Sequence, residues 1–421
     1  MERRNFVKKI AGGFTTSLFT LHNPGYLMDH IKLQGGSYTE EEYWKIIRKK
    51  FPLKDHRIFF NNGTSGPVSL QVLDAVKKQM DEFAETGEYG STDAARERVA
   101  QFFNAMLSEI SLTHNTTEGI NIITWGLPLK RGDEVIITTQ EHVGNALPWL
   151  NRAKIDGINL KPFEPAPTAQ GNVDLIIQNI NARTKVIAIP HITCTTGQVL
   201  PIKEICEIAR SKNIYTAIDG AQTAGSLKLD LKSLGCDFYA SSFHKWMLGP
   251  AGTGFLYVNE KMLDVLQARW VGAHSDTGWD LQTNPPYIKD FVPTSHRYDY
   301  GSQSAALFAG VEAAINLLEE IGMDKVEQRV KELSAYLQHQ LLESGKNIEM
   351  ITPLEEKSRS CMISFRPRTM DYIAFNHIAA KNGFRIRIVP ESNQNAIRIS
   401  THIYNSFEEI DRFVKFTQEV L

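Results

Sequence analysis

Short hydrophobic runs alternate with longer amphipathic stretches over most of the chain. Runs at 134–138, 185–189, 215–218 and 254–258 contain mainly β-branched, aliphatic and aromatic residues and have the length of buried strands. The stretch 202–212, between two of them, places its hydrophobic residues on one side of a helix. Strands that alternate with helices predict an α/β fold with a mostly parallel sheet covered by helices.

The pattern changes after about residue 300. A long helical region over 304–344 is followed by short strands and helices. We therefore expect a large domain over 38–300 and, over 301–421, a long connecting helix and a small α+β C-terminal domain. The elements expected in this smaller domain are strands at 362–365, 385–388 and 396–399 and helices near 370–381 and 406–420.

The composition limits the kind of partner. The chain has 421 residues, with 46 Lys plus Arg and 48 Asp plus Glu, and a formal net charge of −2. This balance gives no general attraction to nucleic acid or to an anionic membrane, so a small-molecule partner is favoured. The four cysteines form no CxxC pair and indicate neither a metal site nor a disulfide framework.

The first 30 residues differ from the rest of the chain. Arg3 and Arg4, with Phe6 nearby, precede an uncharged and weakly hydrophobic stretch over 10–28. This order resembles a twin-arginine export signal over 1–30 and predicts transport of the folded protein to the periplasm. A frayed amphipathic terminus of a cytoplasmic protein is the alternative. The stretch is too polar to predict a stable membrane span.

Polar clusters follow three of the predicted strands. They are Gln-Glu-His at 140–142, the stretch 191–197, and Asp-Gly-Ala-Gln at 219–222. In parallel sheets covered by helices, ligands bind beyond the carboxyl ends of the strands. The sequence therefore predicts a small-molecule site at this edge of the sheet.

Lys245 has surroundings that suit covalent chemistry. It follows the apolar run 236–240 and precedes a turn containing glycine and proline. Asp219 ends another predicted strand, so its carboxylate would point into the same crevice. An aldehyde cofactor held by lysine as a Schiff base needs such a carboxylate to keep its pyridine nitrogen protonated. Alone, Lys245 fits a solvated surface charge and Asp219 fits a turn cap, so the prediction depends on the pair.

Two further segments could serve such a cofactor. The sequence Asn-Thr-Thr-Glu-Gly at 115–119 is typical of a helix start, whose free N–H groups and dipole favour a phosphate. An ordinary Thr N-cap is the alternative. His142 could stack on a ring in the crevice or fill space in the core.

In this order, the motifs resemble those of the class V aminotransferase family of fold type I pyridoxal-phosphate enzymes. The motifs are Asn-Thr-Thr-Glu, Glu-His-x-x-Asn, His-Ile-Thr-x-x-Thr-Gly, Asp-Gly-Ala-Gln, Ser-x-His-Lys and a late Arg-Ile-Ser. The resemblance covers nearly all of the chain after about residue 55. It implies the fold type I architecture, with a mostly parallel sheet of the seven-stranded type in the large domain, and pyridoxal 5'-phosphate as the cofactor.

The resemblance also implies a role for each matching residue. Lys245 would hold the cofactor as a Schiff base and move the proton at the substrate α-carbon. Asp219 would pair with the pyridine nitrogen, Gln222 would hydrogen-bond the phenolic oxygen, and His142 would stack on the ring. The residues implied around the phosphate are Thr116, Thr117, Ser242 and His244.

Two more residues carry implications for assembly and substrate. Ser302 resembles the family residue that reaches the phosphate of the partner's cofactor, which implies a homodimer. Arg398 matches the family arginine that binds the α-carboxylate of an amino acid, a task for which the guanidinium fork is suited.

Three stretches bear on the branch of the family. Desulfurases that resemble this chain carry a nucleophilic cysteine in the stretch matching 387–395, where this chain has none. The entrance segment within 55–68 and the stretch 191–197 resemble the isopenicillin N epimerase-like branch, and Asn62 is implied in substrate binding. Gln222 and Cys194 depart from that branch, which often has His and Ser at these places.

We therefore predict a pyridoxal-phosphate-dependent, aminotransferase-type enzyme that acts at the α-carbon of an amino acid. Transamination comes first because it needs only the residues already named. The alternatives are an isopenicillin N epimerase-like epimerase or a carbon–sulfur lyase, and then a non-catalytic protein that binds the cofactor. The residues considered for lining the substrate pocket are Trp149, Trp270, His274, Trp279, Tyr298 and Arg387.

Overall fold

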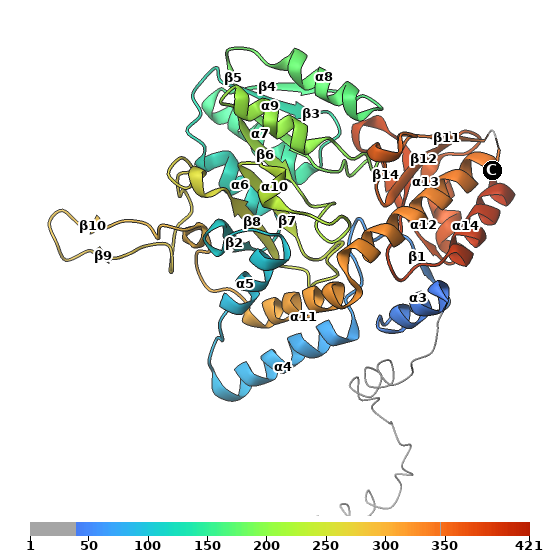
Figure 1. Ribbon diagram of the computed structural model, residues 1–421, viewed down its shortest axis with the longest axis horizontal. Helices are drawn as coiled ribbons and strands as arrows, with labels where there is room; N and C mark the ends of the chain where they lie inside the picture. The colour runs from blue at the N-terminus through green and yellow to red at the C-terminus, as the bar shows by residue number, and fades with distance from the viewer. Residues whose placement is uncertain (1–38, 346) are drawn as a thin grey trace, which may run out of the picture. The chain divides into compact units, whose positions relative to one another are not determined.

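A seven-stranded sheet forms the centre of the larger part of the fold (Figure 1). The computed structural model describes residues 39–345 and 347–421, and Glu40–Leu421 form one compact unit. The sheet has the order β2-β8-β7-β6-β5-β3-β4, and it is parallel except where β8 pairs with β2 and β7. This confirms the predicted mostly parallel sheet. Its strands are β2 (Ile110–Thr113), β3 (Glu134–Thr138), β4 (Asn159–Phe163), β5 (Thr184–Pro190), β6 (Tyr215–Asp219), β7 (Phe238–Ser242) and β8 (Gly254–Val258).

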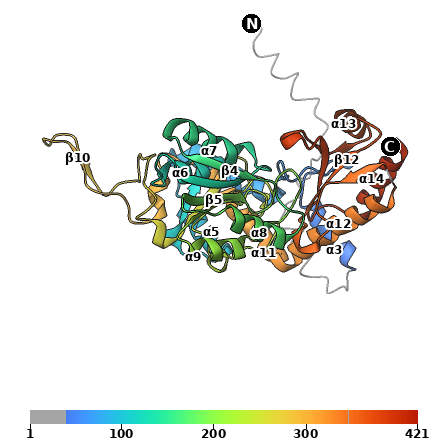
Figure 2. The same cartoon turned by 90° about the horizontal axis from the view of Figure 1, so that it is seen from above.

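Helices cover both faces of this sheet, with α6 and α7 on one side and α5, α8 and α9 on the other (Figure 2). The alternation of side chains along β3 explains both layers. Val135 and Ile137 pack with Ile120 of α6, whereas Ile136 belongs to the core that contains Ile205 of α9. The helices of this part are α4 (Leu70–Thr86), α5 (Asp93–Phe102), α6 (Thr116–Gly126), α7 (Val143–Asp156), α8 (Ala169–Asn179), α9 (Ile202–Ser211) and α10 (Leu231–Leu234).

The helical region predicted over 304–344 is two helices, α11 (Ala305–Ile321) and α12 (Met323–Glu343). Gly322 lies between them with a φ of 89°. This positive φ is strained for residues with a side chain and is suited to glycine, so α11 ends at this point. The expected single connecting helix is therefore corrected to a pair of helices.

A second, four-stranded antiparallel sheet follows, with the order β11-β12-β15-β14. Its hydrophobic core joins Phe365 of the sheet to Phe375 and Phe413 of the two final helices. The elements are β11 (Ile348–Met350), β12 (Met362–Pro367), α13 (Tyr372–Lys381), β14 (Arg387–Val389), β15 (Ala396–Ser400) and α14 (Phe407–Val420).

The strand predicted at 385–388 is split. Its first part, β13 (Phe384–Arg385), pairs in parallel with β1 (Ile58–Phe59) instead of joining the four-stranded sheet. Asn61 then bridges to Ser400 of β15. The chain entering from the N-terminal side is thus fixed beside the C-terminal sheet, next to the strand that carries Arg398.

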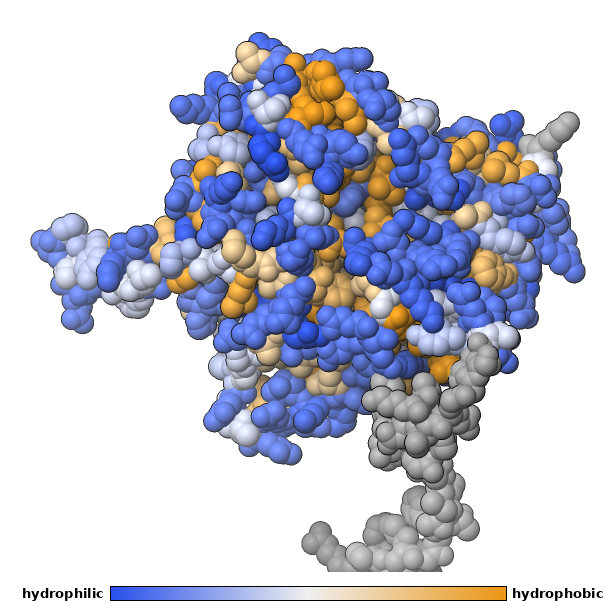
Figure 3. All heavy atoms as spheres, viewed as in Figure 1, coloured by the Kyte–Doolittle hydropathy of each residue, from blue (hydrophilic) through white to orange (hydrophobic). Residues whose placement is uncertain are grey.

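Several elements were not predicted from the sequence. They include α3 (Glu40–Lys49), α4 and α5, and a hairpin of β9 (Trp279–Asp280) and β10 (Tyr287–Ile288) that extends away from the seven-stranded sheet (Figure 1). The face of the molecule in Figure 3 is mainly hydrophilic with scattered hydrophobic patches. This agrees with helices that bury one side only. Short 3-10 helices cover Leu107–Glu109, Glu260–Met262, Ser295–Tyr298, Glu356–Ser358 and Glu391–Asn393.

The proposed export signal over 1–30 lies outside the described residues, so the periplasmic location stays a prediction. Among the described residues, none of the helices has the length and apolar character needed to cross a membrane.

Candidate active site

Four neighbouring strands of the larger sheet, β7, β6, β5 and β3, end at the same edge and direct their following loops toward one cavity. The cavity has a volume of about 180 Å³. The cavity therefore lies at the edge of the sheet that the strand-end rule predicted. Nine of the predicted site residues line the cavity: Thr116, Thr117, His142, Asp219, Gln222, Ser242, His244, Lys245 and Arg398.

Lys245 follows β7 and is buried at the cavity, with 8% of its surface exposed. Among the described residues, its ammonium group has no carboxylate within ion-pair distance. Burial lowers the pKa of Lys245, and the charge of Asp219 opposes this effect. A lysine with a lowered pKa is more often neutral and is then nucleophilic.

Asp219 ends β6 and is buried beside the same cavity. Its Oδ1 accepts a hydrogen bond from the backbone N–H of Ala221 at 2.9 Å. This contact caps the turn, which is the alternative role considered for Asp219 from the sequence. The contact occupies one carboxylate oxygen, so Asp219 can cap the turn and still present a negative charge to the cavity.

The N-terminus of α6 meets the end of β7 at the cavity. Ser242 Oγ accepts a hydrogen bond from the backbone N–H of Thr116 at 2.8 Å and lies 2.7 Å from Thr116 Oγ1. The N-cap is Asn115, whose side chain accepts from the backbone N–H of Glu118 at 3.0 Å, so the alternative of a Thr N-cap is corrected. Thr116 and Thr117 stand in the first helical turn, where the helix dipole favours an anion.

His142 is the N-cap of α7. Its Nδ1 accepts a hydrogen bond from the backbone N–H of Gly144 at 3.0 Å. Burial, followed by the charge of Lys245, lowers the pKa of His142 and favours the neutral ring. A Cβ at Gly144 would lie 2.4 Å from Thr117 Oγ1, so the absence of a side chain keeps space between α6 and His142.

Gln222 holds the entrance segment against the cavity. Its Nε2 donates to the carbonyl of Gly63 at 2.9 Å, and its Oε1 accepts from Trp246 Nε1 at 2.8 Å. Asn62 does not line the cavity within one chain, so its part in substrate binding stays a prediction. It is completely buried, and its Oδ1 accepts from Tyr404 at 2.9 Å. Gly63 and Thr64 of the same segment line the cavity instead.

Arg398 on β15 is 1% exposed and has no carboxylate partner among the described residues. Its Nη1 donates to the carbonyl of Cys194 at 2.6 Å, and its Nη2 donates to Thr64 Oγ1 at 3.2 Å. Its Nε has no hydrogen-bond partner in the part of the chain that the structure describes. Burial lowers the pKa of Arg398 to about 10. A buried guanidinium that lacks a counter-charge fits a site for an anion.

Of the residues considered for lining the substrate pocket, Arg387 lines the cavity. Trp149 and Tyr298 are buried in the core that also contains Val135 of β3 and Ile120 of α6, and Trp270 and Trp279 are exposed. Cys194, in the predicted stretch 191–197, also lines the cavity, although it was not among the predicted site residues. Cys194 stands where the isopenicillin N epimerase-like branch often has serine, and this difference could have pointed to it as a site residue.

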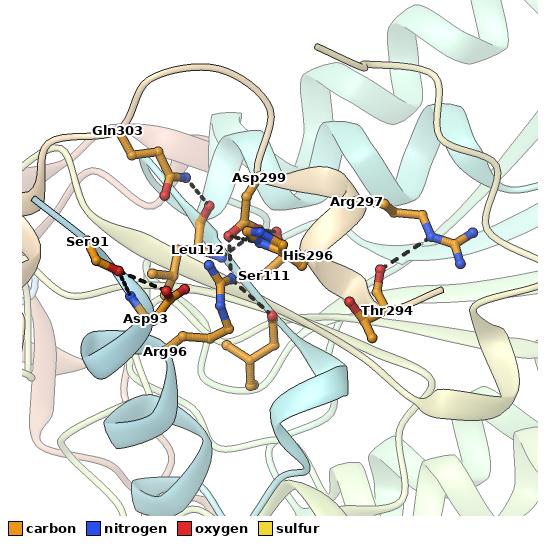
Figure 4. A network of polar contacts seen from close by, with 11 residues as sticks. Ser91, Asp93, Arg96, Ser111, Leu112, Thr294, His296, Arg297, Asp299 and Gln303 are labelled. Atoms are coloured by element: carbon orange, nitrogen blue, oxygen red, sulfur yellow. Dashed lines mark hydrogen bonds and ion pairs between the residues drawn. The ribbon is translucent and has the colours of Figure 1, made fainter. Parts of the chain in front are cut away.

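Ser302 does not join this cavity within one chain. It lines a second cavity that also contains His274. Figure 4 shows the polar network that fixes the preceding turn: the buried Asp299 carboxylate pairs with Arg96 and accepts from Ser111 Oγ at 2.5 Å. The predicted contact of Ser302 with a partner's cofactor, and the homodimer itself, stay predictions.

A pH effect on stability arises at the end of β5. His191 is buried, and its Nδ1 lies 3.1 Å from the hydroxyl of Tyr239. Burial lowers the pKa of His191 from 6.5 to about 4. Between these values the unfolded chain binds a proton that the folded chain does not, so the free energy of unfolding falls as pH falls from 6.5 to 4.

Replacing His191→Asn is expected to reduce this slope by up to about 1.4 kcal/mol per pH unit, because Asn keeps a polar group near Tyr239 without titrating. Urea unfolding at several values between pH 4 and pH 7 measures the slope. If the free energy of unfolding changed equally with pH in the two proteins, the pKa of His191 would be the same in the folded and the unfolded chain.

Comparison with known proteins places the chain among enzymes of one family. The profile of the family Aminotransferase class-V matches residues 59–413. A probable cysteine desulfurase of Pyrococcus abyssi (strain GE5 / Orsay) is 27% identical over 401 residues, covering 89% of this chain and 97% of that protein. Isopenicillin N epimerase of Amycolatopsis lactamdurans is 28% identical over 400 residues, covering 90% and 98%.

Solved structures of the cystine C-S lyase C-DES have a similar fold. One has glycine covalently linked to the PLP cofactor, and it matches with 25% identity and a TM-score of 0.80. Another contains the reaction product cysteine persulfide, and it matches with 26% identity and a TM-score of 0.79. Each comparison covers 88% of this chain and 99% of the other.

The cavity fits pyridoxal phosphate on its own residues. It combines a buried lysine, a carboxylate at a neighbouring strand end and a helix N-terminus suited to phosphate. His244 Nδ1 is buried there without a hydrogen-bond partner in the described parts of the chain, so the site offers a polar group that a ligand could satisfy. Together with the match over 59–413, these features show that the chain belongs to the class V aminotransferase family of pyridoxal-phosphate-dependent enzymes.

Proposed function

We propose that this enzyme is an aminotransferase that acts at the α-carbon of an amino acid. The observation that carries the proposal is the buried guanidinium of Arg398, which shares the cavity with Lys245 and has no carboxylate partner among the described residues. A buried charge is costly unless a counter-charge binds. The α-carboxylate of an amino acid supplies that counter-charge and would place the α-carbon in the cavity that contains Lys245.

Lys245 and Asp219 carry the chemical step in this proposal. Pyridoxal phosphate, when bound, supplies an electron sink for the electrons left by the α-proton. Lys245 would hold the cofactor through Nζ and, once the substrate amine has displaced it, would take the proton from the α-carbon and deliver it to the carbon that carried the aldehyde. Because burial lowers its pKa, Lys245 is suited to accept this proton near neutral pH. Asp219 would keep a proton at the pyridine nitrogen.

The remaining lining residues position the two ligands. Thr116, Thr117 and Ser242 lie where the positive end of the α6 dipole meets the cavity and would hold the phosphate. His244 also lines the cavity, and its Nδ1 has no hydrogen-bond partner within residues 39–345 and 347–421. Burial and the charge of Lys245 lower the pKa of His244 to about 4, so at neutral pH the neutral ring offers either a donor or an acceptor, depending on the tautomer.

Sulfur abstraction, which the name of the Pyrococcus relative indicates, is not favoured here. The stretch 387–395 contains no cysteine. Cys194 lines the cavity, but burial raises its pKa to about 11, so it is a neutral thiol instead of the nucleophilic thiolate. Epimerisation is the second candidate, because a neutral thiol in the cavity can return a proton to the α-carbon.

Incubation of the PLP-loaded protein with a panel of amino acids, with and without keto acids, tests the proposal. We expect amino-group transfer that requires a keto acid, with little racemisation and little sulfide release. Racemisation without a keto acid, lost in Cys194→Ser, would establish the epimerase instead. Sulfide release from cysteine or cystine as the main reaction would establish a carbon–sulfur lyase.

A further inference from the structure

Two arginines face each other across neighbouring strands at the cavity. Arg387 on β14 and Arg398 on β15 are directly opposite in the antiparallel pairing, and both line the cavity. Residues directly opposite in such a pair project from the same face of the sheet, and like charges at these positions destabilise it. After burial, the charge of Arg387 is the largest influence that lowers the pKa of Arg398. The repulsion between the two guanidiniums opposes folding, so their position at the cavity suggests that they bind an anionic ligand.

The two arginines have different partners. Arg398 is almost completely buried and has hydrogen bonds only to neutral oxygens among the described residues. Arg387 is partly exposed and forms a two-pronged ion pair with Glu391, four residues later, in which Nη1 lies 3.3 Å from Oε2 and Nη2 contacts Oε1. The guanidinium fork of Arg387 thus already binds a carboxylate in the manner suited to this pair of groups.

Glu391 is placed so that another carboxylate can replace it. Its side chain is 32% exposed, and its charged partner among the described residues is Arg387. It begins the short segment Glu391–Asn393 beyond β14, outside the sheet that holds the two arginines. A ligand carboxylate that takes its place leaves the charge of Arg387 neutralised and returns Glu391 to solvent, so the exchange need not bury an unpaired charge.

We propose that Arg387 binds the side-chain carboxylate of a dicarboxylic amino acid, or of its keto acid, and that Glu391 occupies this position in the absence of such a substrate. The proposal rests on the proposed function, in which Arg398 binds the α-carboxylate. Two guanidiniums on facing strands then bind the two ends of one ligand. Arg387 determines specificity, whereas Lys245 and Asp219 carry the chemistry.

Glutarate and valerate provide a test that requires no reaction, since both have five carbons and lack an amino group. Calorimetric titration of the PLP-loaded protein is expected to show glutarate binding at least about tenfold tighter than valerate, the gain of one charge-assisted pair. Arg387→Gln should remove this preference and leave valerate affinity unchanged. Glu391→Gln should increase glutarate affinity several-fold, because the competing carboxylate is gone.

Arg385→Gln is the matched control, because Arg385 is an exposed arginine two residues away that does not line the cavity. Equal losses of glutarate and valerate affinity in Arg387→Gln would show that the Arg387–Glu391 pair only braces the segment after β14. Should that variant fail to fold, unchanged glutarate affinity in Glu391→Gln would overturn the proposal in the same way. If the original protein bound both acids equally, the role of Arg387 would be refuted and the role of Arg398 would stand. If it bound neither acid, both roles would be refuted.

Discussion

Replacement of Lys245→Ala is expected to abolish covalent attachment of pyridoxal phosphate and to lower turnover by about 10⁴-fold or more. Lys245 is the buried lysine of the cavity, and burial lowers its pKa toward the neutral, nucleophilic form. Alanine removes both the group that holds the cofactor and the group that moves the α-proton. The cavity itself should persist, because the side chain of Lys245 has no hydrogen bond or ion pair to another described residue that would be lost.

Borohydride treatment of the PLP-loaded protein, followed by digestion and mass spectrometry, measures the attachment directly. The cofactor mass should appear on the peptide that contains Lys245 and be absent from the variant. Lys78→Ala, at an exposed lysine on α4, is the control and should retain both label and turnover. A label on another lysine, or a Lys245→Ala variant with unchanged turnover, would contradict the assignment.

The position of the site could be predicted because it depends on strand ends, which the sequence marks well. Each predicted strand of the larger sheet was a run of hydrophobic residues, and the two faces of β3 alternate between two hydrophobic cores. A parallel sheet brings the residues after such runs to one edge, whatever the helices between them do. His142, Asp219 and Lys245 therefore line one cavity although they are far apart in the chain.

Features that depend on strand register or on a single backbone angle could not be predicted in this way. That Arg387 lies opposite Arg398 follows from the pairing of β14 with β15, and the predicted strand 385–388 gave no sign of its break. The division of the long helix depends on the positive φ of Gly322. Glycine is also tolerated inside helices at a modest cost, so its presence in the sequence did not predict the break. Asn62 does not line the cavity, and its Oδ1 accepts a hydrogen bond from Tyr404, 342 residues later in the chain, a contact that no local pattern predicts.

Replacement of Asp219→Asn is expected to lower turnover by about 10²- to 10³-fold, the usual effect of removing one electrostatic contact that stabilises developing charge. Asn keeps the shape of the side chain and an oxygen that can accept from the backbone N–H of Ala221, the contact that Asp219 Oδ1 makes at 2.9 Å. The free energy of unfolding should therefore change by less than about 1 kcal/mol. Turnover and urea unfolding of the same preparation measure the two effects separately.

Asp219→Asn distinguishes a turn cap from a partner of the pyridine nitrogen, because it removes the charge and preserves the turn. Asp230→Asn is the matched control: Asp230 caps the backbone N–H of Ser233 at the start of α10 with the same type of bond and does not line the cavity. It should leave turnover unchanged. If Asp219→Asn also retained full turnover, Asp219 would be a turn cap like Asp230, and the proton at the pyridine nitrogen would need another partner. Loss of turnover with unchanged stability requires instead that the negative charge itself acts on the bound cofactor.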